Sequence, residues 1–163
     1  MRTLILMRHA KSDWSDSSLA DHDRPLNPRG RRAAPRMAQH LSELGIHAEF
    51  ILASSARRVQ QTVELMQESW SSEAEVLTEN DLYLASPSEI AKHVDRLHDD
   101  WQSVLVVGHN PGMSALCGSL SGGGIEMPTA AVAVFQTEAS SWKHAIARAN
   151  WTLHEYSKPR ELE

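Results

Sequence analysis

The stretch Ser103-Val-Leu-Val-Val-Gly108 constrains the fold of this chain more than any other feature. Its apolar run is unbroken and lacks the alternation of apolar and polar side chains that marks a half-exposed strand. Such a run is typical of a parallel strand that is covered on both faces by other elements. The chain is therefore expected to build a layered fold around a buried, mostly parallel sheet.

Other segments alternate between strand-like and helix-like patterns along the 163 residues. Strands are expected at 3–7, 49–53, 75–78, 130–135 and 151–156, helices at 28–44, 57–68, 87–100 and 112–120, and loops at 69–73 and 122–124. The alternation favours an α/β fold with three α/β/α layers and right-handed crossovers. No linker-like stretch divides the chain, so residues 1–163 are expected to form one domain.

Composition excludes several classes of protein. The 41% of hydrophobic residues can build a core, and the formal net charge of −5 disfavours generic binding to nucleic acid or to an anionic membrane surface. One cysteine, Cys117, excludes an internal disulfide framework and favours a reducing compartment. No apolar stretch approaches the roughly 20 residues that span a bilayer, and the pattern at residues 1–9 leads us to expect no secretory signal. A cytoplasmic protein is expected.

Three of the expected strands end at unusual residues: Arg8-His9, the turn at 54–58, and His109. Ligands of open α/β sheets bind beyond the carboxyl ends of the strands, so these residues should meet at one edge. Arginine presents a fixed fork of donors that matches phosphate oxygens, and a neutral imidazole can attack phosphorus. The combination indicates hydrolysis of a phosphoryl compound through a phosphorylated histidine.

These segments resemble a known family. Leu4-Ile-Leu-Met-Arg-His-Ala-Lys-Ser12 is similar to the opening motif of the histidine phosphatase superfamily, which has the phosphoglycerate mutase-like fold. Ser54-Ser-Ala-Arg-Arg-Val-Gln-Gln-Thr62 resembles its serine-rich turn, in which an arginine precedes a threonine by four residues, and Val106-Val-Gly-His-Asn-Pro-Gly112 resembles its second-histidine motif. The three motifs occur in the family's order, and their combination is specific.

The resemblance implies a role for each matching residue. These are His9 as the phosphoryl acceptor, Arg8, Arg58 and His109 as the phosphate pocket, and Lys11 and Ser12 as either further anion contacts or an exposed charge and a local cap. The four-residue spacing selects Arg58, so Arg57 is expected on the helix surface. Ala10 replaces the family's usual glycine, which requires a backbone without positive φ. Arg24 is expected to form a salt bridge with Asp21 or Asp23.

The short interval between Thr62 and Val104 leaves no room for the large insertion that covers the substrate in sugar-phosphate members, so an open cleft is expected. Members that cleave phosphate esters place a general acid in this interval, and the candidates are Glu79 and Asp81. A phosphoramidate such as phosphohistidine needs no strong acid, because imidazole is a good leaving group.

Small size, an open cleft and the Arg-His-Ala-Lys-Ser opening resemble the bacterial phosphohistidine phosphatase branch. The resemblance implies a phosphohistidine-bearing protein as partner, such as a phosphotransfer domain, and no cofactor or metal. Two alternatives stay open: a phosphatase of small phosphate esters that uses Glu79 or Asp81 as the acid, and a noncatalytic phosphate-binding module.

Overall fold

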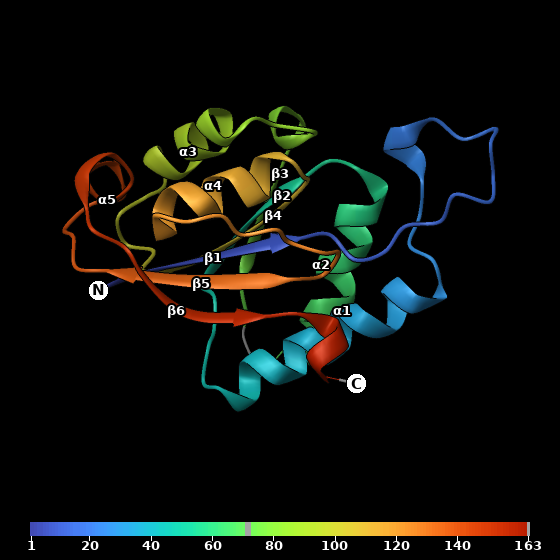
Figure 1. The fold of residues 1–163 in the computed structure, drawn as a ribbon, viewed down its shortest axis with the longest axis horizontal. Helices are drawn as coiled ribbons and strands as arrows, with labels where there is room; N and C mark the ends of the chain where they lie inside the picture. Colours follow the sequence, from blue (N-terminus) through green and yellow to red (C-terminus); the bar gives the residue numbers. More distant parts are fainter. Residues whose placement is uncertain (71–72, 163) are drawn as a thin grey trace.

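A computed structural model describes residues 1–70 and 73–162 (Figure 1). Six strands form one sheet in the order β3-β2-β4-β1-β5-β6. Their bounds are β1 Arg2–Arg8, β2 Phe50–Ser54, β3 Glu75–Glu79, β4 Ser103–Gly108, β5 Val132–Thr137 and β6 Thr152–Ser157. The first four are parallel to one another, whereas β5 runs antiparallel to β1 and β6 antiparallel to β5. The expected mostly parallel sheet is confirmed.

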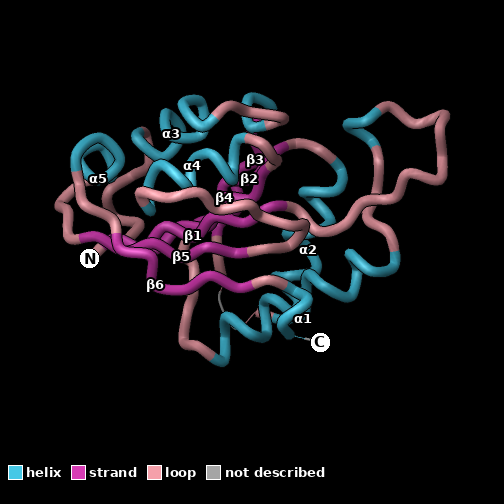
Figure 2. Tube along the Cα trace, viewed as in Figure 1, coloured by secondary structure: helices cyan, strands magenta, loops and turns pink. Residues whose placement is uncertain are grey.

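Helices cover both faces of this sheet (Figure 2). Their bounds are α1 Pro28–Glu43, α2 Arg57–Ser69, α3 Pro87–Asp95, α4 Gly112–Ser121 and α5 Trp142–Arg148. Figure 1 shows α3, α4 and α5 on one side of the sheet and α1 on the other, where α2 also packs. The three-layer α/β/α architecture is therefore confirmed.

The position of β4 in the sheet explains why its sequence is apolar throughout. Leu105 and Val107 belong to the core cluster that contains the buried residues of α1 and α2. Val104 and Val106 belong to the cluster on the opposite face, with α3 and α4. Both faces of the strand are thus removed from water, as an unbroken apolar sequence requires.

Two segments differ from the expected elements. The helix expected at 87–100 ends at Asp95, because the following chain turns so that the carbonyl groups of Asp99 and Trp101 accept hydrogen bonds from the Arg2 guanidinium. Helix α5 was not expected; it is short, and the fully buried Trp142 ties it to the core. The loop expected at 69–73 includes residues 71 and 72, which lie outside the described residues.

The strand order brings the three strand ends together. β2, β4 and β1 are neighbours and parallel, so Ser54, Gly108 and Arg8 all lie at the same edge of the sheet. The segment that follows β1 projects beyond this edge (Figure 1, blue). Within residues 1–70 and 73–162, no helix is long and apolar enough to cross a membrane.

Candidate active site

His9 follows β1 directly and is only 6% exposed. Its Nδ1 lies 2.7 Å from the carbonyl oxygen of Ala10. A carbonyl can only accept a hydrogen bond, so Nδ1 carries the proton and Nε2 keeps its lone pair. Burial, together with His109 and the nearby arginines, lowers the pKa of His9 to about 3. At neutral pH the ring is therefore neutral, with its free nitrogen 3.4 Å from Nε of Arg58.

Arg58 is the second residue of α2 and is almost fully buried. Its guanidinium donates to the carbonyl oxygen of Asp21 at 2.7 Å and to the Asp21 carboxylate at 3.0 Å. Thr62 explains the four-residue spacing of the motif: its hydroxyl donates to the carbonyl of Arg58 at 2.7 Å and accepts from the amide of Ala10 at 3.0 Å. Thr62 thus fixes the first turn of α2 against the chain that follows His9.

The structure also agrees with two smaller predictions about these motifs. Arg57 is exposed on α2, so the spacing argument selected the inward-facing arginine correctly. Among the described residues other than glycine, positive φ occurs at Leu84 and Ala130. Ala10 is not one of them, and a side chain is accommodated there without strain.

His109 follows β4 and lies with its ring centroid 5.3 Å from that of His9. Its Nδ1 is 3.4 Å from the Arg58 guanidinium, which can only donate. Its Nε2 therefore carries the proton and donates to the hydroxyl oxygen of Ser54 at 2.8 Å. Burial and the charge of Arg58 lower the pKa of His109 to about 4. Two neutral imidazoles thus flank one buried guanidinium.

Arg8 lies half-buried at the end of β1 and donates from Nη1 to the carbonyl oxygen of Met127 at 3.0 Å. Its Nε is buried and has no hydrogen-bond partner within the described part of the chain. An unsatisfied buried donor costs roughly 1–3 kcal/mol, which a bound anion would recover. Burial and the charge of Arg58 lower the pKa of Arg8.

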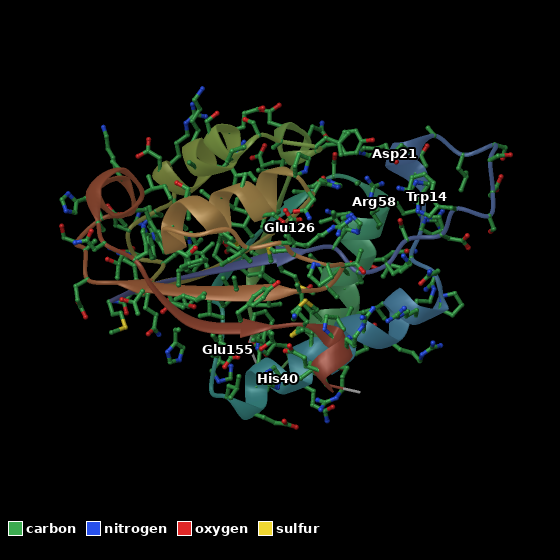
Figure 3. The ribbon with its side chains drawn as sticks, viewed as in Figure 1. Trp14, Asp21, His40, Arg58, Glu126 and Glu155 are labelled. Carbon is green, nitrogen blue, oxygen red and sulfur yellow. The ribbon has the colours of Figure 1, made fainter. Side chains whose placement is uncertain are left out.

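Asp21 and Tyr83 complete the site, and the sequence motifs did not identify them as site residues. The Asp21 carboxylate accepts hydrogen bonds from the Tyr83 hydroxyl, from Arg58 and, at 2.9 Å, from Arg24. These donors, Tyr83 first, hold the pKa of Asp21 well below its usual range. Figure 3 shows Asp21 beside Arg58. The Arg24 salt bridge was expected, and it was the one sequence signal that pointed to Asp21.

A cavity of about 330 Å³ lies at this centre. Its lining residues are Arg8, His9, Lys11, Ser12, Trp14, Asp21, Arg24, Arg58, Leu84, His109, Asn110 and Thr129. The expected phosphoryl acceptor His9 and the three residues of the expected phosphate pocket are therefore brought together, and Lys11 and Ser12 line the same space. We call this space the catalytic cavity.

The two candidate acids lie elsewhere. Glu79 ends β3, and Asp81 is exposed in the following turn, Asn80–Leu82; neither lines the catalytic cavity. Within residues 1–70 and 73–162, no group of three or more His, Cys, Asp or Glu side chains could hold a metal ion.

Proteins of similar sequence and similar fold are known. Residues 4–83 match the model of the histidine phosphatase superfamily, branch 1. An uncharacterized chloroplastic protein of Arabidopsis thaliana is 37% identical over 155 residues, which cover 90% of this chain and 71% of that protein.

Solved structures give the same result over nearly the whole chain. A structure from Nakamurella multipartitia, named "Putative Phosphohistidine Phosphatase SixA", has 32% identity and a TM-score of 0.84 and covers 97% of this chain and 96% of its own. Its namesake from Agrobacterium tumefaciens has 25% identity and a TM-score of 0.81, with 97% and 99% coverage. The chain therefore belongs to the histidine phosphatase superfamily and is a phosphatase that resembles the small bacterial phosphohistidine phosphatases.

Proposed function

We propose that this phosphatase hydrolyses phosphohistidine on a protein, through a covalent intermediate on His9. The neutral ring of His9 lines the catalytic cavity. Its Nδ1 donates to the carbonyl of Ala10, and its unprotonated Nε2, the proposed nucleophile, lies 3.4 Å from Nε of Arg58. Arg8 and Arg58 supply donors for the phosphoryl oxygens, and the buried unpartnered Nε of Arg8 supports this role. Both present a planar fork of donors that matches phosphoryl oxygens.

The reaction would take two steps. In the first, Nε2 of His9 forms a bond to phosphorus while the P–N bond of the substrate breaks. The electron pair of that bond stays on the leaving ring, whose other nitrogen carries a proton, so the ring leaves as neutral imidazole. In the second, water attacks phosphorus and the P–N bond to His9 breaks, which restores the lone pair on Nε2. Both protons of that water stay with the released phosphate. His109, whose Nδ1 lies 3.4 Å from the Arg58 guanidinium, helps to position that cation.

One observation carries the choice of phosphohistidine over a phosphate ester. Among the described residues, Asp21 is the carboxylate that lines the catalytic cavity, and three donors hold it ionised. An ionised carboxylate cannot protonate a leaving group, and the Tyr83 hydroxyl is already engaged with it. An alkoxide leaves poorly without a proton, whereas imidazole does not need a strong acid. The cavity thus suits a phosphoramidate.

Turnover of a phosphohistidine peptide should be compared with turnover of a panel of phosphate esters at equal enzyme concentration. We expect kcat/KM for the phosphohistidine peptide to exceed that for every ester. An ester that is turned over faster than the peptide would contradict the proposal and favour the ester phosphatase.

The covalent intermediate has a direct test. Brief exposure to a ³²P-labelled phosphoryl donor should label the protein in an acid-labile form, and His9→Ala should remove both the label and the activity. We expect a loss of at least about 10³-fold in kcat/KM, as for other removed nucleophiles. If His9→Ala keeps the label, the nucleophile is another residue.

A further inference from the structure

A second cavity, of about 680 Å³, adjoins the catalytic cavity. Arg8, Lys11, Asn110 and Thr129 line both, so the two spaces share a wall. The second cavity extends between the first turns of α1 and the C-terminal turn Pro159–Leu162. It is about twice the size of the catalytic cavity, and the chemistry at His9 leaves it without a role.

Cations dominate its lining. Arg8, Lys11, Arg29, Lys158 and Arg160 face two carboxylates, Glu126 and Glu161. Glu161 already pairs with Lys158 at 3.5 Å. Within the described part of the chain, Lys11, Arg29 and Arg160 form no ion pair, and all three are exposed. The chain as a whole has a formal charge of −5, so this positive surface is a local concentration.

The fold holds Lys11 and Arg29 side by side. The amide of Asn27 donates to the carbonyl oxygen of Lys11 at 3.0 Å, and the Asn27 side chain caps α1 by accepting from the amide of Gly30 at 2.8 Å. Gly30 packs directly on Lys11, because a Cβ at this position would lie 2.2 Å from the carbonyl oxygen of Lys11. Arg29 is therefore anchored beside the residue that leads into the catalytic cavity.

The basic surface continues along α1. Arg29, Arg32 and Arg36 line a third cavity of about 360 Å³ together with Pro159. Their spacing places the three arginines on one side of the helix. Positive charge therefore extends from the rim of the catalytic cavity along α1, over a distance that one phosphoryl group cannot occupy.

We propose that Lys11, Arg29, Lys158 and Arg160, which we call the basic groove, bind an acidic segment of the substrate protein beside its phosphohistidine. This inference rests on the proposed function and names the chemistry of the partner. Carboxylates of the segment would pair with the exposed cations of the groove. Met127, Pro128 and Ala33 add apolar wall, which suits a polypeptide better than a second free phosphate.

The test uses the whole protein and three probes: a phosphohistidine peptide flanked by glutamates, the same peptide flanked by glutamines, and phosphoimidazole, which cannot reach the groove. The first variant is Arg29→Glu. Its matched control is Arg31→Glu, on the same turn of α1 and also exposed, but lining none of the three cavities. Arg160→Glu repeats the test from a different element.

Arg29→Glu and Arg160→Glu should each raise KM for the glutamate-flanked peptide by about three- to tenfold, the range for reversal of one exposed charge, and leave kcat unchanged. Arg31→Glu should not change this KM. Turnover of phosphoimidazole should be the same in all variants. If Arg29→Glu does not fold, as judged by its circular dichroism, Arg160→Glu decides the question.

Two results would overturn the inference: equal KM values of the natural chain for the two peptides, or equal effects of Arg29→Glu and Arg31→Glu. The proposed function fails differently, because a chain that does not use phosphohistidine would turn over neither peptide nor phosphoimidazole faster than a phosphate ester. The two failures are therefore separable in one set of assays.

Discussion

The catalytic cavity and the basic groove share a wall, yet they hold positive charge in different ways. In the catalytic cavity Arg58 is buried, and hydrogen bonds to Asp21 fix its guanidinium. In the groove Lys11, Arg29 and Arg160 are exposed and form no ion pair within the described residues. A buried guanidinium with fixed donors favours an anion of one geometry, whereas exposed cations attract anions with little directional preference.

The two regions are therefore suited to different ligands. The buried donors of Arg8 and Arg58 surround a space suited to one phosphoryl group. Because these donors are fixed, a group of a different shape would bind poorly there. The exposed cations can adapt to many arrangements of carboxylates, as a surface that meets a protein must. Reaction specificity would thus come from the catalytic cavity, and preference among partners from the groove.

The largest expected effect separates geometry from charge. Arg58→Lys keeps the charge but loses the fork, so we expect kcat/KM for phosphoimidazole to fall by about 10²- to 10³-fold, the range for loss of one transition-state donor. Arg57→Lys, on the exposed side of the same turn, is the matched control and should stay within about twofold. The same change in the groove, Arg29→Lys, should also be nearly silent. Near-natural activity of Arg58→Lys would remove the distinction between the two regions.

A second prediction concerns the stability of the protein at acidic pH. It distinguishes the two regions because it depends only on groups in the catalytic cavity. The folded pKa values of about 3 for His9 and about 4 for His109 lie below the ordinary histidine value near 6.5. Below that value the unfolded chain binds protons that the folded chain refuses, so stability must fall as pH decreases from 6.5 toward 4. The lowered pKa of Asp21 acts only below its ordinary value near 4, outside the upper part of this window.

Urea unfolding at pH 6.5 and pH 5 measures this effect. Each histidine should contribute roughly 2 kcal/mol to the loss of unfolding free energy over that interval. His9→Gln and His109→Gln should each reduce the pH dependence by about that amount, whatever they do to the stability at pH 6.5. An unchanged slope in both variants would show that the folded rings take up protons as readily as the unfolded ones.

The two regions also differ in how far the sequence could predict them. Most of the helices and strands, and the meeting of two histidines and two arginines at one edge of the sheet, followed from local patterns: apolar periodicity, strand ends and motif spacing. Tyr83 was not predicted as a site residue, because its partner Asp21 is 62 residues away in the sequence and no local pattern encodes that contact. The basic groove was not predicted for the same reason. Its residues at the C-terminal end lie beside those near α1 only because the turn Pro159–Leu162 folds onto α1. The short helix α5 depends likewise on long-range packing of Trp142.

The smallest expected effect tests two carboxylates that line neither region. Glu79→Gln and Asp81→Asn should change turnover of a phosphohistidine peptide by less than about twofold, because both side chains lie outside the catalytic cavity and the leaving imidazole needs no acid. Asp21→Asn is the informative contrast, because it removes a charge that contacts Arg58 directly at 3.0 Å. A loss of about a hundredfold in either Glu79→Gln or Asp81→Asn is the magnitude of a general acid. That result would mean that the loop after β3 closes over the substrate. Phosphate esters would then be favoured over phosphohistidine as substrates.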